Sequence, residues 1–348
     1  MTTKVKTYRI DGIDMDISMA EDISQSASGE QKKIAKAILD WNYNEEFTFL
    51  TSGSTGPPKL LVFTKDQIKA SIYQSQQAFE LLQSDNILLC LPMKYVAGKM
   101  MLYRALHLGM NVITAQPKIV LQDVMNHSVS FAAFIPLQVE VLLGSKAGAK
   151  WFSSIKNVII GGADISISLE KKLATYANNI YHTYGMTETL THIAIRKLSI
   201  GGLSYFQALP NISLSQNDNK TLMITAHHLN VQVKTHDVVD FLNDKSFRIK
   251  GRIDNVINSG GLKIYPEELE AIFKKYIETK LVVIGESDNH LGERVILVVE
   301  SQSVIDPEWI RAAQSELPKN KWPKKVKYLD ELPLTENGKI KRKMILGS

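Results

Sequence analysis

Short apolar runs alternate with amphipathic stretches between residues 46 and 184, and this alternation constrains the fold more than any other feature. The apolar runs have the length and residue types of strands, and the stretches between them have the spacing of helices. The predicted strands are 47–50, 59–63, 86–92, 111–115, 129–136, 157–163 and 179–184. The predicted helices are 65–82, 99–108, 137–143 and 169–177. Together they predict an α/β fold, with layered helices on a largely parallel sheet.

The character of the chain changes after Thr191, where short β-like segments follow one another. They are 203–209, 221–227, 229–235, 237–242 and 246–250, and they predict a small antiparallel β region. A second change comes near residue 253. Beyond it, helices at 266–276 and 307–317 and strands at 281–286 and 295–300 predict a smaller α+β domain. The predicted domains are therefore an N-terminal domain, 1–252, and a C-terminal mobile domain, 253–348.

Composition excludes several classes of protein. The net charge of +5 is mild, so it suits anionic small molecules without requiring a nucleic acid partner. No apolar run approaches the roughly 20 residues that span a bilayer, and the N-terminus lacks a signal-peptide core. The single cysteine, Cys90, lies in an apolar run, which favours a buried and inert thiol. These features predict a cytoplasmic protein without stable membrane insertion, either a monomer or a homodimer.

The segment TSGSTGPPK, residues 51–59, follows one predicted strand and precedes another. Its two glycines permit tight turns, its hydroxyls and N–H groups can hold an anion, and Lys59 adds a positive charge. It is not the P-loop of ordinary NTPases, because Pro58 precedes the lysine and Leu60 follows it. The segment predicts a binding loop for a polyphosphate, and a flexible turn is the simpler alternative. The candidate ATP-binding residues here are Thr51, Ser52, Gly53, Ser54, Thr55, Gly56 and Lys59.

Three further segments accompany this loop: YGMTET at 184–189, GRIDNVINSGGLKIYPEELE at 251–270, and PLTENGKIKR at 333–342. In this order, the four segments resemble the motifs of the adenylate-forming superfamily. That superfamily includes acyl- and aryl-CoA ligases, luciferases and peptide-synthetase adenylation domains. The resemblance implies that an acid and MgATP form an acyl-adenylate, which a thiol then converts to a thioester. The implied cofactors are ATP, Mg²⁺ and coenzyme A.

The resemblance assigns roles to individual residues. Tyr184 would stack on adenine beside the small residues Gly161, Gly162 and Ala163. Thr187 would touch the α-phosphate, and Glu188 would hold Mg²⁺, which prefers oxygen ligands. Lys339 would be the catalytic lysine of the adenylation step, although a basic tail is often only solvated.

Other assignments fall between the two later motifs. Asp237 would bind the ribose hydroxyls, although His236 stands where the superfamily usually has glycine. Arg252 would also approach the ribose, and Asp254 would be the hinge. Gly260 and Gly261 would line the coenzyme A tunnel.

The segments at 91–110 and 184–195 most resemble the o-succinylbenzoyl-CoA synthetases of menaquinone biosynthesis, although those enzymes commonly have histidine where this chain has Tyr95. Their substrate carries a second carboxylate, which needs a cation. The candidate cations are Lys94, Lys99, Arg104, His192 and Arg196, with Lys99 preferred. The predicted acid-binding residues are Tyr95, Gly98, Lys99 and His192.

The phosphate loop begins on the order of a hundred residues earlier here than is usual in the superfamily, which predicts a trimmed N-terminal domain. Three alternatives stay open. They are another acyl- or aryl-CoA ligase, an adenylation enzyme that loads a carrier protein, and a nucleotide-binding protein without catalysis.

Overall fold

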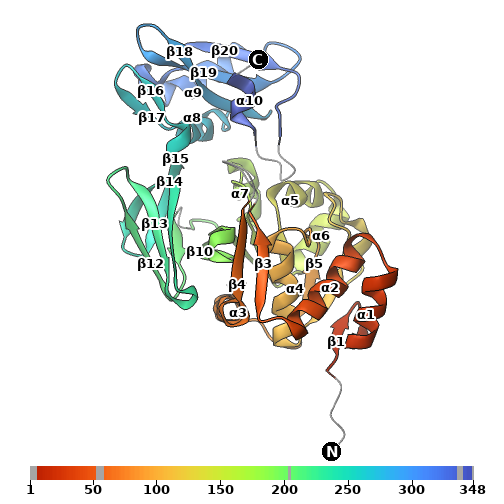
Figure 1. Cartoon of the computed structure of the whole chain (residues 1–348). Helices are drawn as coiled ribbons and strands as arrows, with labels where there is room; N and C mark the ends of the chain where they lie inside the picture. The colour runs from red at the N-terminus through yellow and green to blue at the C-terminus, as the bar shows by residue number, and fades with distance from the viewer. Residues whose placement is uncertain (1–5, 52–58, 203–204, 335–339, 347–348) are drawn as a thin grey trace, which may run out of the picture. The chain divides into compact units, whose positions relative to one another are not determined.

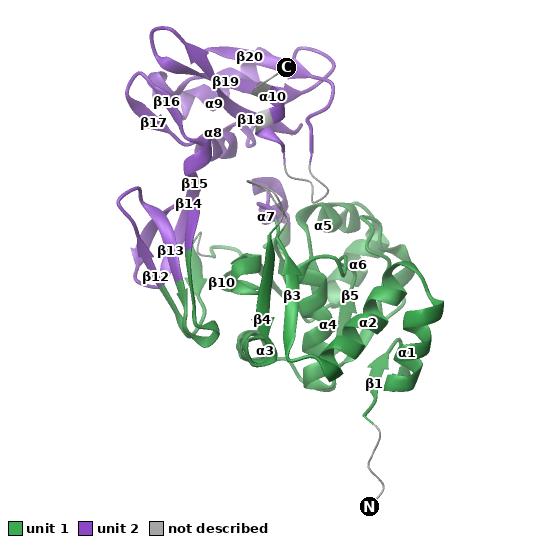
Figure 2. Cartoon of the chain, in the orientation of Figure 1, with its two compact units in different colours: residues 1–162, 173–213, 225–233 green, residues 163–172, 214–224, 234–348 purple. Residues whose placement is uncertain are grey.

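A computed structural model of the chain describes residues 6–51, 59–202, 205–334 and 340–346. The chain forms two compact units (Figure 2). The first contains residues 1–162, 173–213 and 225–233, and the second contains residues 163–172, 214–224 and 234–348. The predicted domain boundary near residue 253 lies inside the second unit, so it stays a prediction.

The first unit contains a sheet with five neighbouring parallel strands, in the order β9–β8–β7–β5–β6. Of these strands, β5 is labelled in Figure 1. Their bounds are β5 Asn86–Leu89, β6 Asn111–Thr114, β7 Phe131–Phe134, β8 Asn157–Ile160 and β9 Asn179–Gly185. Beyond β6 lie β1 (Tyr8–Ile10) and β2 (Ile13–Met15), and beyond β9 lie β10 (His192–Lys197) and β11 (Phe206–Ala208). The predicted α/β fold with a largely parallel sheet is confirmed.

These strands are continuous apolar runs in the sequence because they are buried. Every residue of β7 and of β8 is buried, as expected for parallel strands covered on both faces. Cys90, just after β5, is buried as well, and burial raises the pKa of its thiol to about 12. The prediction of an inert thiol is therefore confirmed.

The helices of the first unit are α1 Ile17–Ser26, α2 Gly29–Tyr43, α3 Lys65–Phe79, α4 Val96–Leu108, α5 Pro136–Leu143 and α6 Lys146–Ser154. A capping box begins α3: the side chains of Thr64 and Gln67 each accept the other residue's backbone N–H. The sequence analysis missed α1, α2 and α6. Ile34, Ile38 and Trp41 of α2 are buried, so their spacing of four and three residues was the missed signal.

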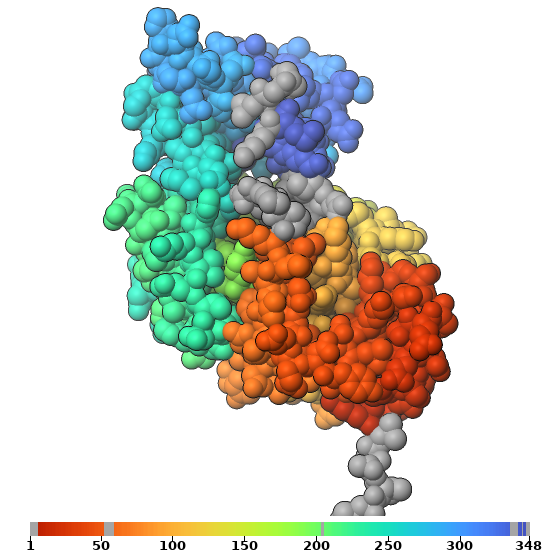
Figure 3. Space-filling view, in the orientation of Figure 1, coloured from red at the N-terminus to blue at the C-terminus, as the bar shows by residue number. Residues whose placement is uncertain are grey.

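Strands β3 (Glu46–Leu50) and β4 (Leu60–Thr64) form a separate antiparallel pair outside the parallel sheet. The segment 51–59 is therefore the connection of a hairpin. Strands β3 and β4 lie at the surface of the first unit (Figure 3). Leu60 and Val62 of β4 are exposed. Phe47, Phe49 and Phe63 are buried on the other side of this pair.

The β region contains β12 Ile212–Gln216, β13 Thr221–Ala226, β14 Val231–Asn243 and β15 Ser246–Arg252, hydrogen-bonded in that order. Strand β14 joins two segments that were predicted as separate strands, and β12 was not predicted. Strands β14 and β15 pair antiparallel, with Asp237 opposite Arg252.

The rest of the second unit is a five-stranded sheet with helices. Its strands are β16 Ile257–Ser259, β17 Leu262–Ile264, β18 Leu281–Asp288, β19 Gly292–Glu300 and β20 Lys325–Leu329. Its helices are α8 Pro266–Phe273, α9 Pro307–Ser315 and α10 Arg342–Leu346; α7, Ile167–Leu173, lies mostly in this unit as well. The predicted α+β character is confirmed, whereas β20 and α10 were missed in the basic tail. Among the described residues, every helix is too short or too polar to cross a bilayer.

Candidate functional site

The base of the predicted phosphate loop is closed by two hydrogen bonds. The N–H of Thr51 donates to the carbonyl of Lys59 at 2.9 Å, and the N–H of Lys59 donates to the Thr51 hydroxyl at 2.8 Å. Residues 52–58 lie outside the described residues, so the predictions for Ser52, Gly53, Ser54, Thr55 and Gly56 stay predictions. The closed base fixes where the loop leaves β3 and rejoins β4.

Gly161 and Gly162 follow β8 at the carboxyl edge of the parallel sheet. A side chain on Gly161 would place its Cβ 2.6 Å from the Thr183 hydroxyl, so only glycine lets the chain run this close to β9. Gly162 has a φ of 81°, which also favours glycine. These two residues therefore leave a surface without side chains beside β9. Ala163, the third predicted member of this strip, begins a stretch of the second unit.

The segment Tyr184–Glu188 lies at the same carboxyl edge, at the end of β9. Tyr184 is buried, with its ring centroid 5.9 Å from that of Phe206 on β11. A Cβ on Gly185 would lie 2.1 Å from the carbonyl oxygen of Thr191, so the turn requires glycine there. After it, the 3₁₀ turn Thr187–Thr189 presents Thr187 and Glu188, both half-buried.

The turn after β9 is held by its own last residue. The Thr189 hydroxyl donates to the carbonyl of Thr191 at 2.9 Å and accepts the N–H of Met186 at 3.2 Å. Thr189 is buried, so the turn is fixed to the core at this residue. The structure thus places Thr187 and Glu188 beyond the carboxyl end of β9, next to the glycines after β8.

Glu188 was also predicted as a Mg²⁺ ligand. Among the described residues, no group of three or more His, Cys, Asp or Glu side chains could enclose a metal ion. A single carboxylate still fits Mg²⁺, because this ion usually binds proteins through one or two carboxylates and takes its other ligands from phosphates and water. The donor set is therefore that of a metal–nucleotide complex rather than of a resident metal site.

The first turn of α4 and the N-cap residue before it carry three of the predicted acid-binding residues. A Cβ on Gly98 would lie 2.4 Å from the carbonyl oxygen of Pro92, so this glycine allows α4 to pack on the preceding turn. Lys99 donates to the carbonyl of Thr48 at 2.9 Å and lies 5.3 Å from the centre of the Phe49 ring. Burial lowers the pKa of Lys99, and the charge of Asp40 partly opposes this. The third residue, Tyr95, precedes the helix, and the ammonium of Lys94 lies 5.2 Å from its ring centre.

His192, the fourth predicted acid-binding residue, is buried at the start of β10. Its Nε2 lies 3.1 Å from the Ser75 hydroxyl, and its ring meets Phe79 edge-on at 5.2 Å. Burial, and then the charge of Arg104, hold the pKa of His192 well below its ordinary value. The imidazole is therefore neutral at neutral pH and carries no positive charge for an acid, and its contact with an acid stays a prediction.

Arg104 on α4 is a buried cation in this region. Lys99 had been preferred to it as the predicted cation for the second carboxylate of the acid. The Nη2 of Arg104 donates to the Thr191 hydroxyl at 3.2 Å, and its Nη1 lies 3.4 Å from the sulfur of Met101. Its Nε is buried without a partner, and none of the described carboxylates pairs with it. Burial lowers the pKa of Arg104 to about 10, so it stays charged at neutral pH. A buried guanidinium without an acid opposes folding.

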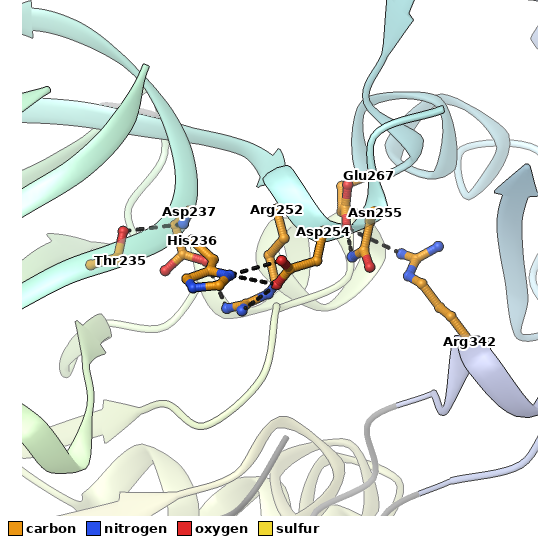
Figure 4. Close-up of polar contacts among 8 residues, drawn as sticks. All are labelled: Thr235, His236, Asp237, Arg252, Asp254, Asn255, Glu267 and Arg342. Atoms are coloured by element: carbon orange, nitrogen blue, oxygen red, sulfur yellow. Dashed lines mark hydrogen bonds and ion pairs between the residues drawn. The ribbon is translucent and has the colours of Figure 1, made fainter. Parts of the chain in front are cut away.

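The predicted ribose and hinge residues of the second unit do lie together (Figure 4). Arg252 donates to Asp237 at 3.2 Å and to Asp254 at 3.0 Å. The Nδ1 of His236 lies 2.8 Å from each carboxylate oxygen of Asp254. His236, which stands where the superfamily usually has glycine, is thus part of the same polar cluster as Arg252 and Asp254.

Gly260 and Gly261 form the two-residue turn between β16 and β17. Their φ values are 57° and 79°, as a type I′ hairpin turn requires at both positions. The turn alone requires glycine at both positions, whether or not they line a coenzyme A tunnel. Their contact with coenzyme A stays a prediction.

The PLTENGK motif is described only at its ends, because residues 335–339, including Lys339, lie outside the described residues. Leu334 and Ile340 form an antiparallel bridge, and the N–H of Lys341 donates to the carbonyl of Pro333 at 2.8 Å. Arg342 is not a solvated tail residue. It donates to both carboxylate oxygens of the buried Glu270, at 2.5 and 2.9 Å, and to the carbonyl of Val283 at 2.7 Å.

Known proteins are similar to this chain in sequence along most of its length. The sequence profile described as AMP-binding enzyme matches residues 15–234. The chain is 26% identical over 339 residues to the 2-succinylbenzoate–CoA ligase of Bacillus mycoides, covering 87% of this chain and 70% of that protein. It is 24% identical over 350 residues to the ligase of the same name from Bacillus pumilus, covering 90% of this chain and 71% of that protein.

Solved structures with a similar fold include an acyl-CoA synthetase (AMP-forming)/AMP-acid ligase II-like protein from Dyadobacter fermentans. It superposes with a TM-score of 0.64 at 26% identity and covers 95% of this chain and 97% of that one. The o-succinylbenzoate coenzyme A synthetase (MenE) of Bacillus subtilis, in complex with ATP and magnesium, gives a TM-score of 0.73 at 22% identity. That alignment covers 86% of this chain and 69% of the synthetase.

Proposed function

This chain belongs to the AMP-binding enzyme family, and from that premise we propose that it activates a carboxylic acid with ATP and transfers the acyl group to coenzyme A. In the first step the carboxylate attacks the α-phosphate of ATP, giving an acyl-adenylate and pyrophosphate. In the second step the thiol attacks the acyl carbon, and AMP leaves. A free carboxylate is a poor acyl donor, whereas AMP is a good leaving group, which explains why ATP is needed.

The observation that carries this proposal is the pair of turns after β8 and β9. Ligands of α/β sheets bind beyond the carboxyl ends of the strands, and both turns lie there. Gly161 and Gly162 leave a flat surface, while Tyr184, Thr187 and Glu188 supply an aromatic ring, a hydroxyl and a carboxylate. These groups suit adenine, a phosphate oxygen and a phosphate-bound Mg²⁺. When bound, Mg²⁺ would neutralise phosphate charge.

We propose 2-succinylbenzoate as the acid, as in the relatives that carry this name. Arg104 supports the choice. The acid has one carboxylate that reacts and one that does not, and the second needs a cation outside the ATP site. Arg104 is buried and charged, and it lies against Thr191, three residues after Glu188. Lys99 is less suited, because its ammonium is directed to the carbonyl of Thr48.

Further parts of the proposal concern the second unit and the cellular setting. Asp237 and Arg252 would bind the ribose, Asp254 would be the hinge, and Lys339 would bridge the carboxylate and the α-phosphate. We place the reaction in the cytoplasm, where ATP and coenzyme A are available, with a monomer or homodimer as the working form.

The test is ATP–pyrophosphate exchange across a panel of acids: 2-succinylbenzoate, benzoate, phthalate, malonate and a long-chain fatty acid. We expect exchange with 2-succinylbenzoate at a kcat/KM at least about 100-fold above that with benzoate, which corresponds to about 2.7 kcal/mol. Equal values for benzoate and 2-succinylbenzoate would refute the acid assignment. Exchange with none of these acids would contradict adenylation of this substrate class.

The acceptor thiol is tested separately. Free coenzyme A should release AMP from the adenylate, with the thioester detected by mass spectrometry. If only a phosphopantetheine carrier protein accepts the acyl group, the chain is an adenylation enzyme that loads a carrier, and the coenzyme A assignment is wrong.

A further inference from the structure

Four charged or titratable side chains of the second unit form one chain of contacts (Figure 4). His236 and Asp237 are neighbours on β14, Arg252 ends β15, and Asp254 lies in the 3₁₀ turn that follows. The contacts run from His236 to Asp254 at 2.8 Å, from Asp254 to Arg252 at 3.0 Å, and from Arg252 to Asp237 at 3.2 Å. The two ends of this chain of contacts, His236 and Asp237, are adjacent in the sequence, and Asp237 also lies opposite Arg252 in the pairing of β14 with β15.

Arg252 is shared between the carboxylates of Asp237 and Asp254, and His236 supplies a second donor to Asp254. A guanidinium binds a carboxylate best with two parallel N–H bonds, whereas here each acid receives one. Asp254 receives its remaining donor from His236. Without that donor, Arg252 would be the one described side chain that donates to Asp254, and the two carboxylates would compete for the guanidinium.

The ionisation of Asp254 agrees with this geometry. Burial alone would raise the pKa of its carboxyl, but the hydrogen bonds from His236 and Arg252 and their charges lower it below the ordinary value. Asp254 is therefore an anion with two donors. Its side chain is 35% exposed and that of His236 is 52% exposed, so the pair contributes little to stability. Its effect is on where the Arg252 side chain lies.

Resting on the proposed function, we propose that His236 is a positioning residue for ribose recognition. By holding Asp254, it keeps Arg252 on Asp237 and so orients the Asp237 carboxylate toward the two ribose hydroxyls of ATP. Asp237 is well placed for this role, because its side chain is only 13% exposed and its N–H is bound by the Thr235 hydroxyl at 3.1 Å. A carboxylate fixed at both backbone and side chain can accept two hydroxyl donors in one geometry.

The experiment compares the Kd values of ATP and of 3′-deoxyATP by calorimetry, without any acid, for the full-length chain. Wild type should prefer ATP, and Asp237→Ala should abolish the preference. His236→Leu, which cannot donate, should reduce the preference by about fivefold to tenfold, the effect of one weakened hydrogen bond. His236→Asn, which places an amide N–H near the position of Nδ1, should restore it. His290→Leu, at an exposed histidine outside the cluster, is the matched control.

The outcomes separate this inference from the function on which it rests. A preference lost in Asp237→Ala but intact in His236→Leu overturns the role of His236 alone. A preference intact in Asp237→Ala overturns the ribose assignment itself. A His236→Asn variant as defective as His236→Leu overturns the donor role. If His236→Leu does not fold, His236→Ala provides the same comparison.

Discussion

Arg104 is a charged side chain in a place where charge is expensive. It is fully buried, one of its nitrogens has no partner, and its described neighbours supply a hydroxyl and a thioether rather than a carboxylate. Proteins retain such groups when a ligand completes them, because burial of an unpaired ion opposes folding. The residue therefore connects the energetics of the first unit with the identity of the acid.

Arg104→Met removes the charge while keeping similar volume. We expect kcat/KM for 2-succinylbenzoate to fall about 100-fold, because the non-reacting carboxylate of the acid loses its cation. The free energy of unfolding should not decrease, since an uncompensated buried charge is removed. Steady-state exchange assays and urea unfolding measure the two quantities. Lys99→Met is the matched control, and a loss of 2-succinylbenzoate use in Lys99→Met but not in Arg104→Met would reverse the assignment.

His192 gives a prediction for pH dependence. Its pKa in the folded state is well below 6.5, so the unfolded state takes up a proton first as the pH falls. Its contribution to stability is therefore complete above about pH 6.5 and decreases below it, by at most about 1.4 kcal/mol per pH unit. His192→Asn should flatten the pH dependence of unfolding between about pH 5 and 6.5 and leave it unchanged above pH 7. An identical slope in wild type and variant between pH 5 and 6.5 would show that His192 is not buried as a neutral ring.

Among the elements, the C-terminal segment illustrates how a basic sequence becomes part of a core. Arg342, at the start of α10, reaches Glu270 of α8 and the carbonyl of Val283 on β18. Glu270 also accepts the N–H of Val283 at 2.7 Å. One buried ion pair thus joins a strand and two helices, and it anchors the chain just after the PLTENGK motif.

Arg342→Met should lower the free energy of unfolding by about 3 kcal/mol, because Glu270 remains buried without its cation. Adding Glu270→Gln removes that charge and keeps an acceptor for Val283, so the double variant should recover most of the loss. Urea unfolding of the single and double variants provides the measurement. A double variant no more stable than Arg342→Met would mean that packing, not the buried charge, accounts for the cost.

For the molecule as a whole, the proposed reaction draws on both compact units. Under this proposal the first unit would supply the turns after β8 and β9 and the surroundings of Arg104, and the second would supply Asp237, Arg252 and Lys339. If Lys339 acts only on the α-phosphate, it is needed for adenylation and not for attack by the thiol. Measuring adenylation and thioester formation separately therefore tests whether Lys339 acts in the first step alone.

Lys339→Ala should lose ATP–pyrophosphate exchange by at least about 100-fold, since charge that develops at the α-phosphate loses its partner. The same variant should still convert a supplied acyl-adenylate to the coenzyme A thioester at nearly the wild-type rate. Lys341→Ala, at the exposed neighbouring lysine, serves as control. Equal loss of both half-reactions would indicate a folding defect or a different role for Lys339.

Local patterns along the chain were enough to predict the α/β class, the parallel strands and the chemistry. Buried parallel strands are continuous apolar runs, and glycines, hydroxyls and charges needed at a nucleotide site lie in short contiguous motifs. The resemblance of YGMTET to a superfamily motif selected Tyr184, Thr187 and Glu188 before their positions were known. The two helices of residues 17–43 were missed although α2 carries a helical apolar spacing.

Only the tertiary structure decided which charges have partners. Nothing local distinguishes Lys99 from Arg104, yet one reaches the carbonyl of Thr48 and the other is buried without an acid. His236 and Asp254 are 18 residues apart and meet because β14 and β15 pair. Arg342 looked like a tail residue and pairs with Glu270, 72 residues before it. Partnership between charges depends on distances across the fold, and a linear pattern does not contain those distances.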